Sequence, residues 1–197
     1  MPRLAVSIVF AVAALAAGGC ASAQKAAPAQ AIDGTAVDPL AGPAGSLGVV
    51  VFVSHECPIA NAMAPDLTRL AQAARARGVD FYAVHPATWA TTDIARRHAQ
   101  EFGLAASITV LVDPSQRIAR AFGATVTPEA AVYRRDGEGG FRTLYLGRVS
   151  DLYAGIGRRR AQPTTNDLAD AIDLSIAGRP VPEPYPKAIG CFIELQR

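Results

Sequence analysis

Apolar residues along the chain form short continuous runs that alternate with stretches where they recur at helical spacing. The run VVVFVS at 49–54 is rich in β-branched residues, which is typical of a buried parallel strand. Apolar residues then recur at helical spacing over 67–74, and Pro58 and Gly78 suit the two ends of this helix. The same criteria predict strands at 79–84, 108–112, 130–134 and 141–149, and helices at 92–102, at 114–122 and from Thr164 or Thr165 to 177.

This order of elements predicts an α/β fold, a three-layer α/β sandwich with a mixed central sheet. Helices separate the early strands, whereas the turn DGEGG at 136–140 joins the last two strands as an antiparallel hairpin. The length of 197 residues, of which 50% are hydrophobic and 18% charged, suits one globular domain.

Charge and cysteine content argue against several classes of function. The net charge is +2 and no long basic run occurs, so nucleic acid is not an expected partner. Three cysteines are too few for a disulfide scaffold or a four-cysteine zinc site.

The first 23 residues are interpreted as an export signal. Arg3 precedes the apolar run 4–17, which is shorter than the ~20 residues that a membrane span needs, so a transmembrane helix is less favoured. Two processing sites overlap: the A-x-A pattern at 21–23, and a lipobox-like sequence that would place a lipid on Cys20. The protein is therefore expected in the cell envelope, either soluble in the periplasm or lipid-anchored. Attachment to a membrane is expected only through that possible lipid anchor at Cys20.

The rest of the chain is divided by composition. Residues 24–45 are rich in Ala, Pro and Gly and are interpreted as a linker. The domain is expected over 46–180, and 181–197 form a C-terminal tail that carries Cys191.

Cys57 is the main chemical signal, because it lies where a buried strand ends and a helix begins. The first turn of a helix offers unpaired N–H groups and a partial positive charge, which stabilise a thiolate and lower the thiol pKa. The sequence therefore predicts a functional thiol at Cys57, in preference to a buried structural cysteine. A nucleophilic role also requires that solvent or substrate reach the sulfur.

The segment VVFVSHECPIANAMAPDL, the later VTP, the DG turn and the final helix resemble the thioredoxin-like superfamily. Within it, the redoxin proteins related to alkyl hydroperoxide reductase and thiol-specific antioxidant (AhpC/TSA) are most similar, over about residues 45–178. The resemblance implies a thioredoxin-like fold, a nucleophilic Cys57, and a cis peptide at Thr127-Pro128 beside it. Ser54 matches the Ser or Thr that peroxiredoxins carry three residues before their reactive cysteine.

Several positions depart from these families. Ala60 occupies the second thiol position of a C-x-x-C motif, so a local exchange between two cysteines is impossible. Peroxiredoxins also place an arginine beside the thiolate, at a position that aligns with Pro128 here. Arg134, Arg135 or Arg148 are the candidates to replace that guanidinium, and without one peroxide polarisation is weaker.

Cys191 is the natural partner of Cys57, and three interpretations remain open. It could act as a resolving thiol that attacks oxidised Cys57, or form a static disulfide that fixes the tail. Alternatively, both thiols stay unpaired. The first is preferred, and it makes the protein a thiol-based redox enzyme whose partner is a thiol or disulfide protein or a hydroperoxide.

No cofactor is expected under this interpretation. The alternative is a copper-binding delivery module like the Sco-type chaperones, with Cys57, Cys191, His55 and His85 as a soft sulfur and imidazole ligand set. A third possibility is a non-catalytic envelope domain that is stabilised by one disulfide. Trp89 is expected to pack in the core rather than to cover the thiol.

Overall fold

The computed structural model describes residues 28–137 and 139–196. The predicted export signal and its Cys20 lie outside these residues. None of the helices described has both the length and the apolarity that crossing a membrane requires.

The helices are α1 (Pro58–Arg75), α2 (Thr92–Glu101), η1 (Leu104–Ala106), α3 (Arg117–Phe122) and α4 (Asp167–Ile176). The strands are β1 (Ala29–Ala31), β2 (Ala36–Val37), β3 (Leu47–Phe52), β4 (Asp80–His85), β5 (Thr109–Val112), β6 (Val126–Thr127), β7 (Glu129–Arg135), β8 (Phe141–Gly147), β9 (Tyr153–Gly155), β10 (Arg158–Arg159) and β11 (Cys191–Phe192).

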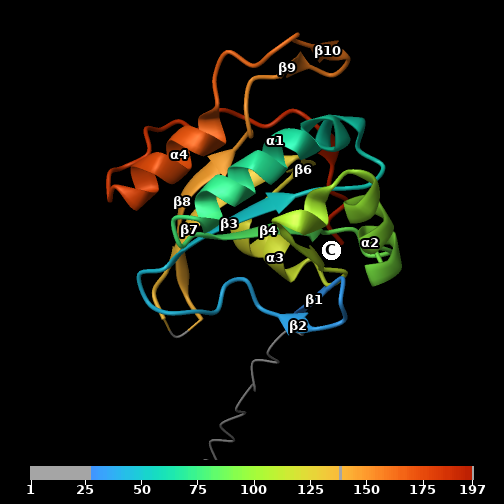
Figure 1. Ribbon diagram of the computed structural model, residues 1–197, viewed down its shortest axis with the longest axis horizontal. Coiled ribbons are helices and arrows are strands. Elements are labelled where there is room, and N and C mark those ends of the chain that lie inside the picture. The colour runs from blue at the N-terminus through green and yellow to red at the C-terminus, as the bar shows by residue number, and fades with distance from the viewer. Residues whose placement is uncertain (1–27, 138, 197) are drawn as a thin grey trace, which may run out of the picture.

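The main sheet has seven strands in the order β2-β1-β5-β4-β3-β7-β8 (Figure 1). β3 pairs in parallel with β4, and β4 with β5, whereas β7 runs antiparallel to β3 and β8 antiparallel to β7. The predicted mixed sheet, with its parallel part and its C-terminal hairpin, is thus confirmed.

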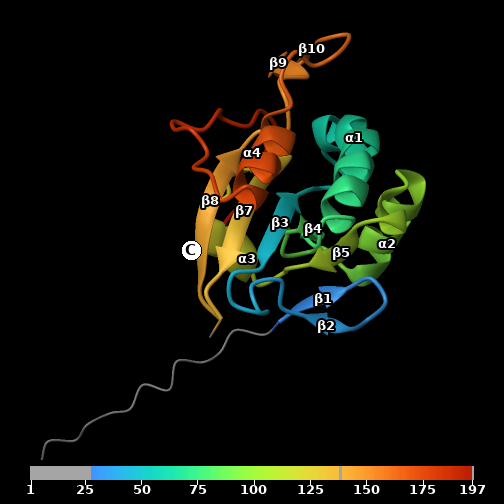
Figure 2. The same ribbon diagram turned by 60° about the vertical axis from the view of Figure 1, so that its left-hand side comes forward.

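Helices cover both faces of this sheet. Val49 and Val51 of β3 point into the core cluster formed with α1, α2 and α4, whereas Val50 and Phe52 point into the cluster formed with α3. All six residues of β3 are buried, as the continuous apolar run predicts for a central strand. Figure 2 shows α1 and α2 next to each other on the same side of β3, β4 and β5. The result is the expected three-layer sandwich.

Two helices begin later than predicted, because aspartate carboxylates bind backbone N–H groups in or just before their first turns. Asp113 accepts hydrogen bonds from the N–H groups of Arg117 and Ile118, so α3 begins at Arg117 and not at 114. Asp151 accepts from the N–H groups of Thr164 and Thr165, so neither threonine caps α4, which begins at Asp167. Aspartate commonly binds such unpaired donors.

The segment expected as a linker contributes β1 and β2 to the sheet. β1 pairs antiparallel with β5, opposite Leu111 and Val112, and β2 pairs with β1. These strands have three and two residues, and their buried members, Ala29 and Ala31, are small. Such a short, weakly hydrophobic alternation leaves too little periodicity for a sequence-based prediction.

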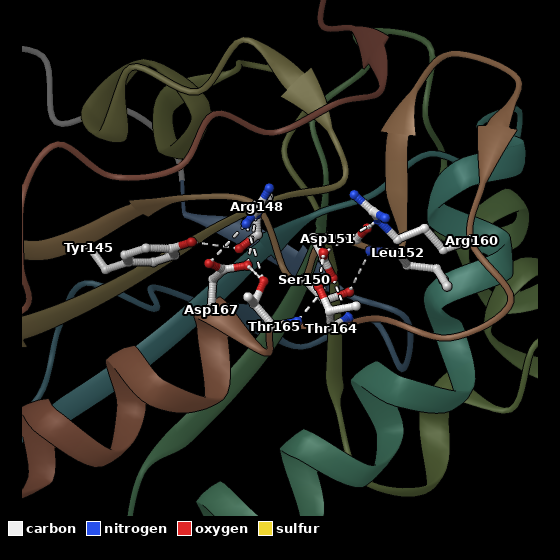
Figure 3. A network of polar contacts seen from close by, with 9 residues as sticks. All are labelled: Tyr145, Arg148, Ser150, Asp151, Leu152, Arg160, Thr164, Thr165 and Asp167. Atoms are coloured by element: carbon white, nitrogen blue, oxygen red, sulfur yellow. Dashed lines mark hydrogen bonds and ion pairs between the residues drawn. The ribbon is translucent and has the colours of Figure 1, made fainter.

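A polar network joins the end of β8 to the start of α4 (Figure 3). Arg148 donates to the carboxylate of Asp167 and to the hydroxyl of Thr165, while Asp151 binds Thr164 and Arg160. Hydrogen bonds from the threonines lower the pKa of Asp151 to about 2. This network fixes the base of the β9–β10 hairpin, which projects from the body of the domain in Figures 1 and 2.

Candidate thiol site

Cys57 is the N-cap residue of α1, five residues beyond the end of β3. Its backbone is extended, with φ −89° and ψ 105°, and its Sγ accepts a hydrogen bond from the N–H of Ala60 at 3.5 Å. Pro58 is the first residue of the helix, as the sequence predicts. The thiol also lies 2.9 Å from the carbonyl oxygen of Thr127, to which it donates. The strand end and the helix start therefore hold this sulfur against a second segment of the chain.

Thr127 and Pro128 form that second segment, and the peptide bond between them is cis, which confirms the expectation. Thr127 ends β6, the strand to which β11 is paired, and Cys191 lies opposite Thr127 in that pairing. The pairing brings the tail against the Cys57 segment. Gly190 makes the approach possible, since a Cβ atom there would lie 1.9 Å from the carbonyl oxygen of Thr127.

Cys57 and Cys191 are both free thiols, and both line the same cavity beside Thr127. Burial raises the pKa of Cys57, but several hydrogen bonds outweigh burial and lower this pKa below its ordinary value. They come from the N–H of Ala60, the side chain of Thr127, and the side chain and N–H of Cys191. Burial and the adjacent Cys57 raise the pKa of Cys191 to about 11. Of the two, Cys57 is therefore the thiol that ionises first.

Cys57 has no exposed surface, so the sequence-based requirement of a reachable sulfur is not met in this conformation. The sulfur adjoins a cavity of about 190 Å³. The tail forms one wall of the cavity, and the loop after β4 forms the other. The lining residues are Ser54, Glu56, Cys57, Pro86, Ala87, Thr88, Trp89, Thr127, Cys191, Phe192, Ile193 and Glu194. Access to Cys57 thus depends on the same segment that carries Cys191.

Trp89 belongs to this cavity and not to the core. Its side chain is 47% exposed and packs edge-on against the ring of His55, with 5.3 Å between the ring centroids. The expectation of core packing is therefore wrong. Ser54, also in the lining, accepts a hydrogen bond from the N–H of Glu56.

The four side chains of the copper alternative are not brought together. His85 is buried and its Nε2 lies 3.2 Å from Nδ1 of His98, while Nε2 of His98 binds the side chain of Asn61. Asn61 in turn donates to the backbone carbonyl of His55, so this chain of bonds supports the loop before Cys57. Over residues 28–137 and 139–196, no group of three or more His, Cys, Asp and Glu side chains could hold a metal ion.

Both imidazoles in this chain of bonds are neutral in the folded protein. Burial lowers the pKa of His85 to about 3, and burial together with the charge of His55 lowers the pKa of His98 to about 4. The unfolded chain binds these protons near pH 6.5, so acidification below that pH favours unfolding, at up to about 1.4 kcal/mol per pH unit for each histidine.

We expect His98→Gln to weaken this acid sensitivity, because an amide keeps a donor and an acceptor but does not titrate. Urea unfolding at pH 7.5, 5.5 and 4.5 would measure it. Between the two lower values, the variant should lose about 1.4 kcal/mol per pH unit less than the unmodified protein. Equal slopes for the two proteins would show that His98 is not held neutral.

None of the three candidate arginines lies at the thiol. Arg135 is buried against the carbonyl of Pro39, and Arg134 binds the carbonyls of Gly45 and Ser175. Arg148 binds Asp167 at the start of α4 (Figure 3). Among the described residues that line the cavity, none is an arginine or a lysine. The peroxiredoxin guanidinium has no replacement from these side chains.

The sequence analysis missed two residues that shape the site. Gly190 precedes Cys191 and allows the close approach to Thr127. Gln116 binds both walls of the cavity through backbone carbonyls of Pro86 and Glu194. The sequence holds a weak signal for the first, a glycine beside a cysteine, but no signal for the second, because it acts through distant segments.

Comparison with known proteins agrees with this geometry. The model of the AhpC/TSA family matches residues 24–143, which is more than half of the chain. The chain belongs to the AhpC/TSA family. No curated protein matches the sequence. The match to the family model begins at residue 24, so it includes the segment that holds β1 and β2.

Solved structures are similar over most of the chain. An uncharacterized conserved protein from Geobacillus kaustophilus is 27% identical, with a TM-score of 0.69 over 86% of this chain and 90% of that one. A hypothetical protein from Sinorhizobium meliloti is 22% identical, with a TM-score of 0.69 over 85% and 90%. A thioredoxin-like protein from Aeropyrum pernix is 16% identical, with a TM-score of 0.51 over 77% and 89%. The likeness to the Aeropyrum pernix protein shows that the fold of this AhpC/TSA protein is thioredoxin-like.

Proposed function

We propose that this AhpC/TSA protein is a thiol-disulfide oxidoreductase of the cell envelope, with Cys57 as nucleophile and Cys191 as resolving thiol. One observation carries the proposal: β11 places Cys191 opposite Thr127, whose carbonyl oxygen lies 2.9 Å from the thiol of Cys57, and both cysteines line the same cavity. A thiolate is the attacking form of a cysteine, and a second thiol in contact can take over the bond that it forms.

The reaction begins when the Cys57 thiolate attacks one sulfur of a substrate disulfide. A mixed disulfide forms between Cys57 and one half of the substrate, and the other half leaves as a thiolate. Cys191 then loses its proton to that leaving thiolate and attacks Sγ of Cys57. The second half of the substrate leaves as a thiolate and takes a proton from solvent. The products are two substrate thiols and a Cys57–Cys191 disulfide, which an external dithiol returns to the reduced state.

The residues around the sulfurs have supporting roles in this proposal. The N–H of Ala60 and the side chain of Thr127 stabilise the thiolate of Cys57. Thr127 and Pro128 form the wall against which the substrate sulfur would be aligned, and Ser54 lines the same cavity. Reduction of a hydroperoxide is less well supported, because no arginine or lysine lines the cavity to polarise the peroxide bond.

The proposal is tested by titrating the reduced protein with 2-hydroxyethyl disulfide and following its mass. We expect one equivalent of disulfide to be consumed, two thiols to be released, and the protein to lose two hydrogens with a Cys57–Cys191 cross-link in the peptide map. Release of a single thiol with a stable adduct would contradict resolution by Cys191. Consumption of hydrogen peroxide at a higher rate than disulfide would favour a peroxidase.

The charge of the cavity predicts a preference among disulfides. Glu56 and Glu194 are exposed at its mouth, with no lining cation to offset them. We expect the cationic disulfide cystamine to react about 10-fold faster than the anionic 3,3′-dithiodipropionate, each rate being divided by its rate with a free model thiol. The ratio should fall in 1 M salt and in Glu56→Gln. A ratio of one at low salt would contradict this preference.

A further inference from the structure

Gln116 has an unusual backbone for its residue type. It lies in the turn between β5 and α3 with φ +58°, and it is the one non-glycine residue with positive φ in the part of the chain that the structure describes. Glycine adopts this conformation without steric cost, whereas a residue with a Cβ is strained there. The side chain of Gln116 is nevertheless buried, with 1% exposure. A buried side chain on a strained backbone points to a specific role for that side chain.

That side chain binds segments that are distant in sequence. Its Nε2 donates to the carbonyl oxygens of Pro86 at 3.1 Å and of Glu194 at 2.7 Å, and its Oε1 accepts from the N–H of Gln196 at 2.8 Å. Arg120 completes the set, since it donates to Oε1 of Gln116 and to the carbonyl of Gln196. Both donors and the acceptor of the amide are thereby satisfied.

These bonds connect the two walls of the thiol cavity. Pro86 begins the loop that carries Trp89, and Glu194 belongs to the tail that covers Cys57 from the other side. The tail has few other backbone attachments beyond Cys191: β11 has two residues, and the N–H of Ile193 donates to the carbonyl of Thr125. Phe192 is 86% exposed and adds little burial, so the packing of this part of the tail comes from Ile193, which is partly buried against the cluster formed with α3.

We propose that Gln116 is a positioning residue that holds the tail closed, and that its release from the tail admits the substrate to Cys57. With the tail closed, Cys191 lies against Cys57 and the sulfur is covered, which suits resolution of a mixed disulfide but not its formation. With the tail open, the cavity loses one wall and Cys57 is accessible. Gln116 thus sets the balance between attack and resolution. The effect on attack and resolution rests on the proposed function, whereas the closure of the tail over Cys57 does not.

The test is the substitution Gln116→Gly in the full chain. Glycine suits the positive φ, so the turn is relieved of strain and the fold is not expected to suffer. We expect about 10-fold or faster labelling of Cys57 by iodoacetamide, read from the peptide mass, because at least two hydrogen bonds to the tail are lost. The equilibrium constant for forming the Cys57–Cys191 disulfide against glutathione should fall by about 10-fold.

Two further variants separate closure from a general loss of structure. Gln116→Asn tolerates positive φ but is one methylene shorter, so it should also open the tail. Gln72→Ala removes an exposed glutamine from α1 and should leave both readouts unchanged. Unaltered labelling of Cys57 in Gln116→Gly would overturn the inference, as would faster labelling that is matched by a fall in melting temperature. If the disulfide never forms in the unmodified protein, the proposed function fails, whereas the labelling rates still decide whether Gln116 closes the tail.

Discussion

Substitution of Cys57 by serine is expected to lower the rate of disulfide reduction by more than about 1,000-fold, because a serine hydroxyl is not ionised near neutral pH and does not attack a disulfide. Release of thiols from 2-hydroxyethyl disulfide measures the loss. The variant changes one buried atom at the N-cap of α1, and serine is itself a good N-cap residue. The fold should therefore be retained.

Cys191→Ser is the matched control for this prediction. It keeps Cys57, so the first attack should still occur and the reaction should stop at a mixed disulfide, visible as a mass increase equal to half of the reagent. A Cys57→Ser protein that releases thiols at an unchanged rate would remove Cys57 from the mechanism.

Gly190→Val should separate the two thiols without touching either of them. The carbonyl oxygen of Thr127 lies 1.9 Å from where a Cβ would be, and this neighbour is backbone that cannot rotate away. β11 can then no longer pair with β6, so Cys191 moves away from Cys57. We expect formation of the intramolecular disulfide to fall by about 100-fold or more, since the advantage of a resolving thiol held in contact is lost.

The same variant should expose Cys57 to iodoacetamide, because the tail that covers it is displaced. Lys187→Ala, at an exposed position of the same tail, is the control and should change neither the disulfide nor the labelling. Disulfide formation at the normal rate in Gly190→Val would show that Cys191 reaches Cys57 from a conformation other than the one described. It would also weaken the argument from β11 for the proposed function.

The parts of the fold that the sequence predicts well are those in which one local signal decides the structure. The buried run at 49–54 becomes β3, and the helix ends at Pro58 and Gly78 are close to the observed α1. By contrast, β1 and β11 have three and two residues and exist only because β5 and β6 offer them a partner. A strand that depends on a distant partner leaves little trace in its own segment.

The candidate site also contains features that local sequence signals predict and features that depend on tertiary packing. Placing Cys57 at a helix N-terminus follows from the strand, the Cys-Pro pair and the helix that succeed one another along the chain. The histidines illustrate the opposite case, because His85 and His98 each lie on separate elements and their bond depends on how β4 and α2 pack. The copper alternative, in which His55 and His85 join the thiols, rested on the residue types that copper prefers, and these do not specify where a ring points.

The sequence by itself determined the order of the longer strands and helices and the thiol at the start of α1, because hydrophobic periodicity and helix-end preferences act between near neighbours. Only the tertiary structure decided that the tail returns to Thr127, 64 positions earlier, that it covers Cys57, and that Gln116 binds both walls of the cavity. These contacts form between segments that are far apart in the sequence. No periodic pattern within one such segment identifies the segment that packs against it.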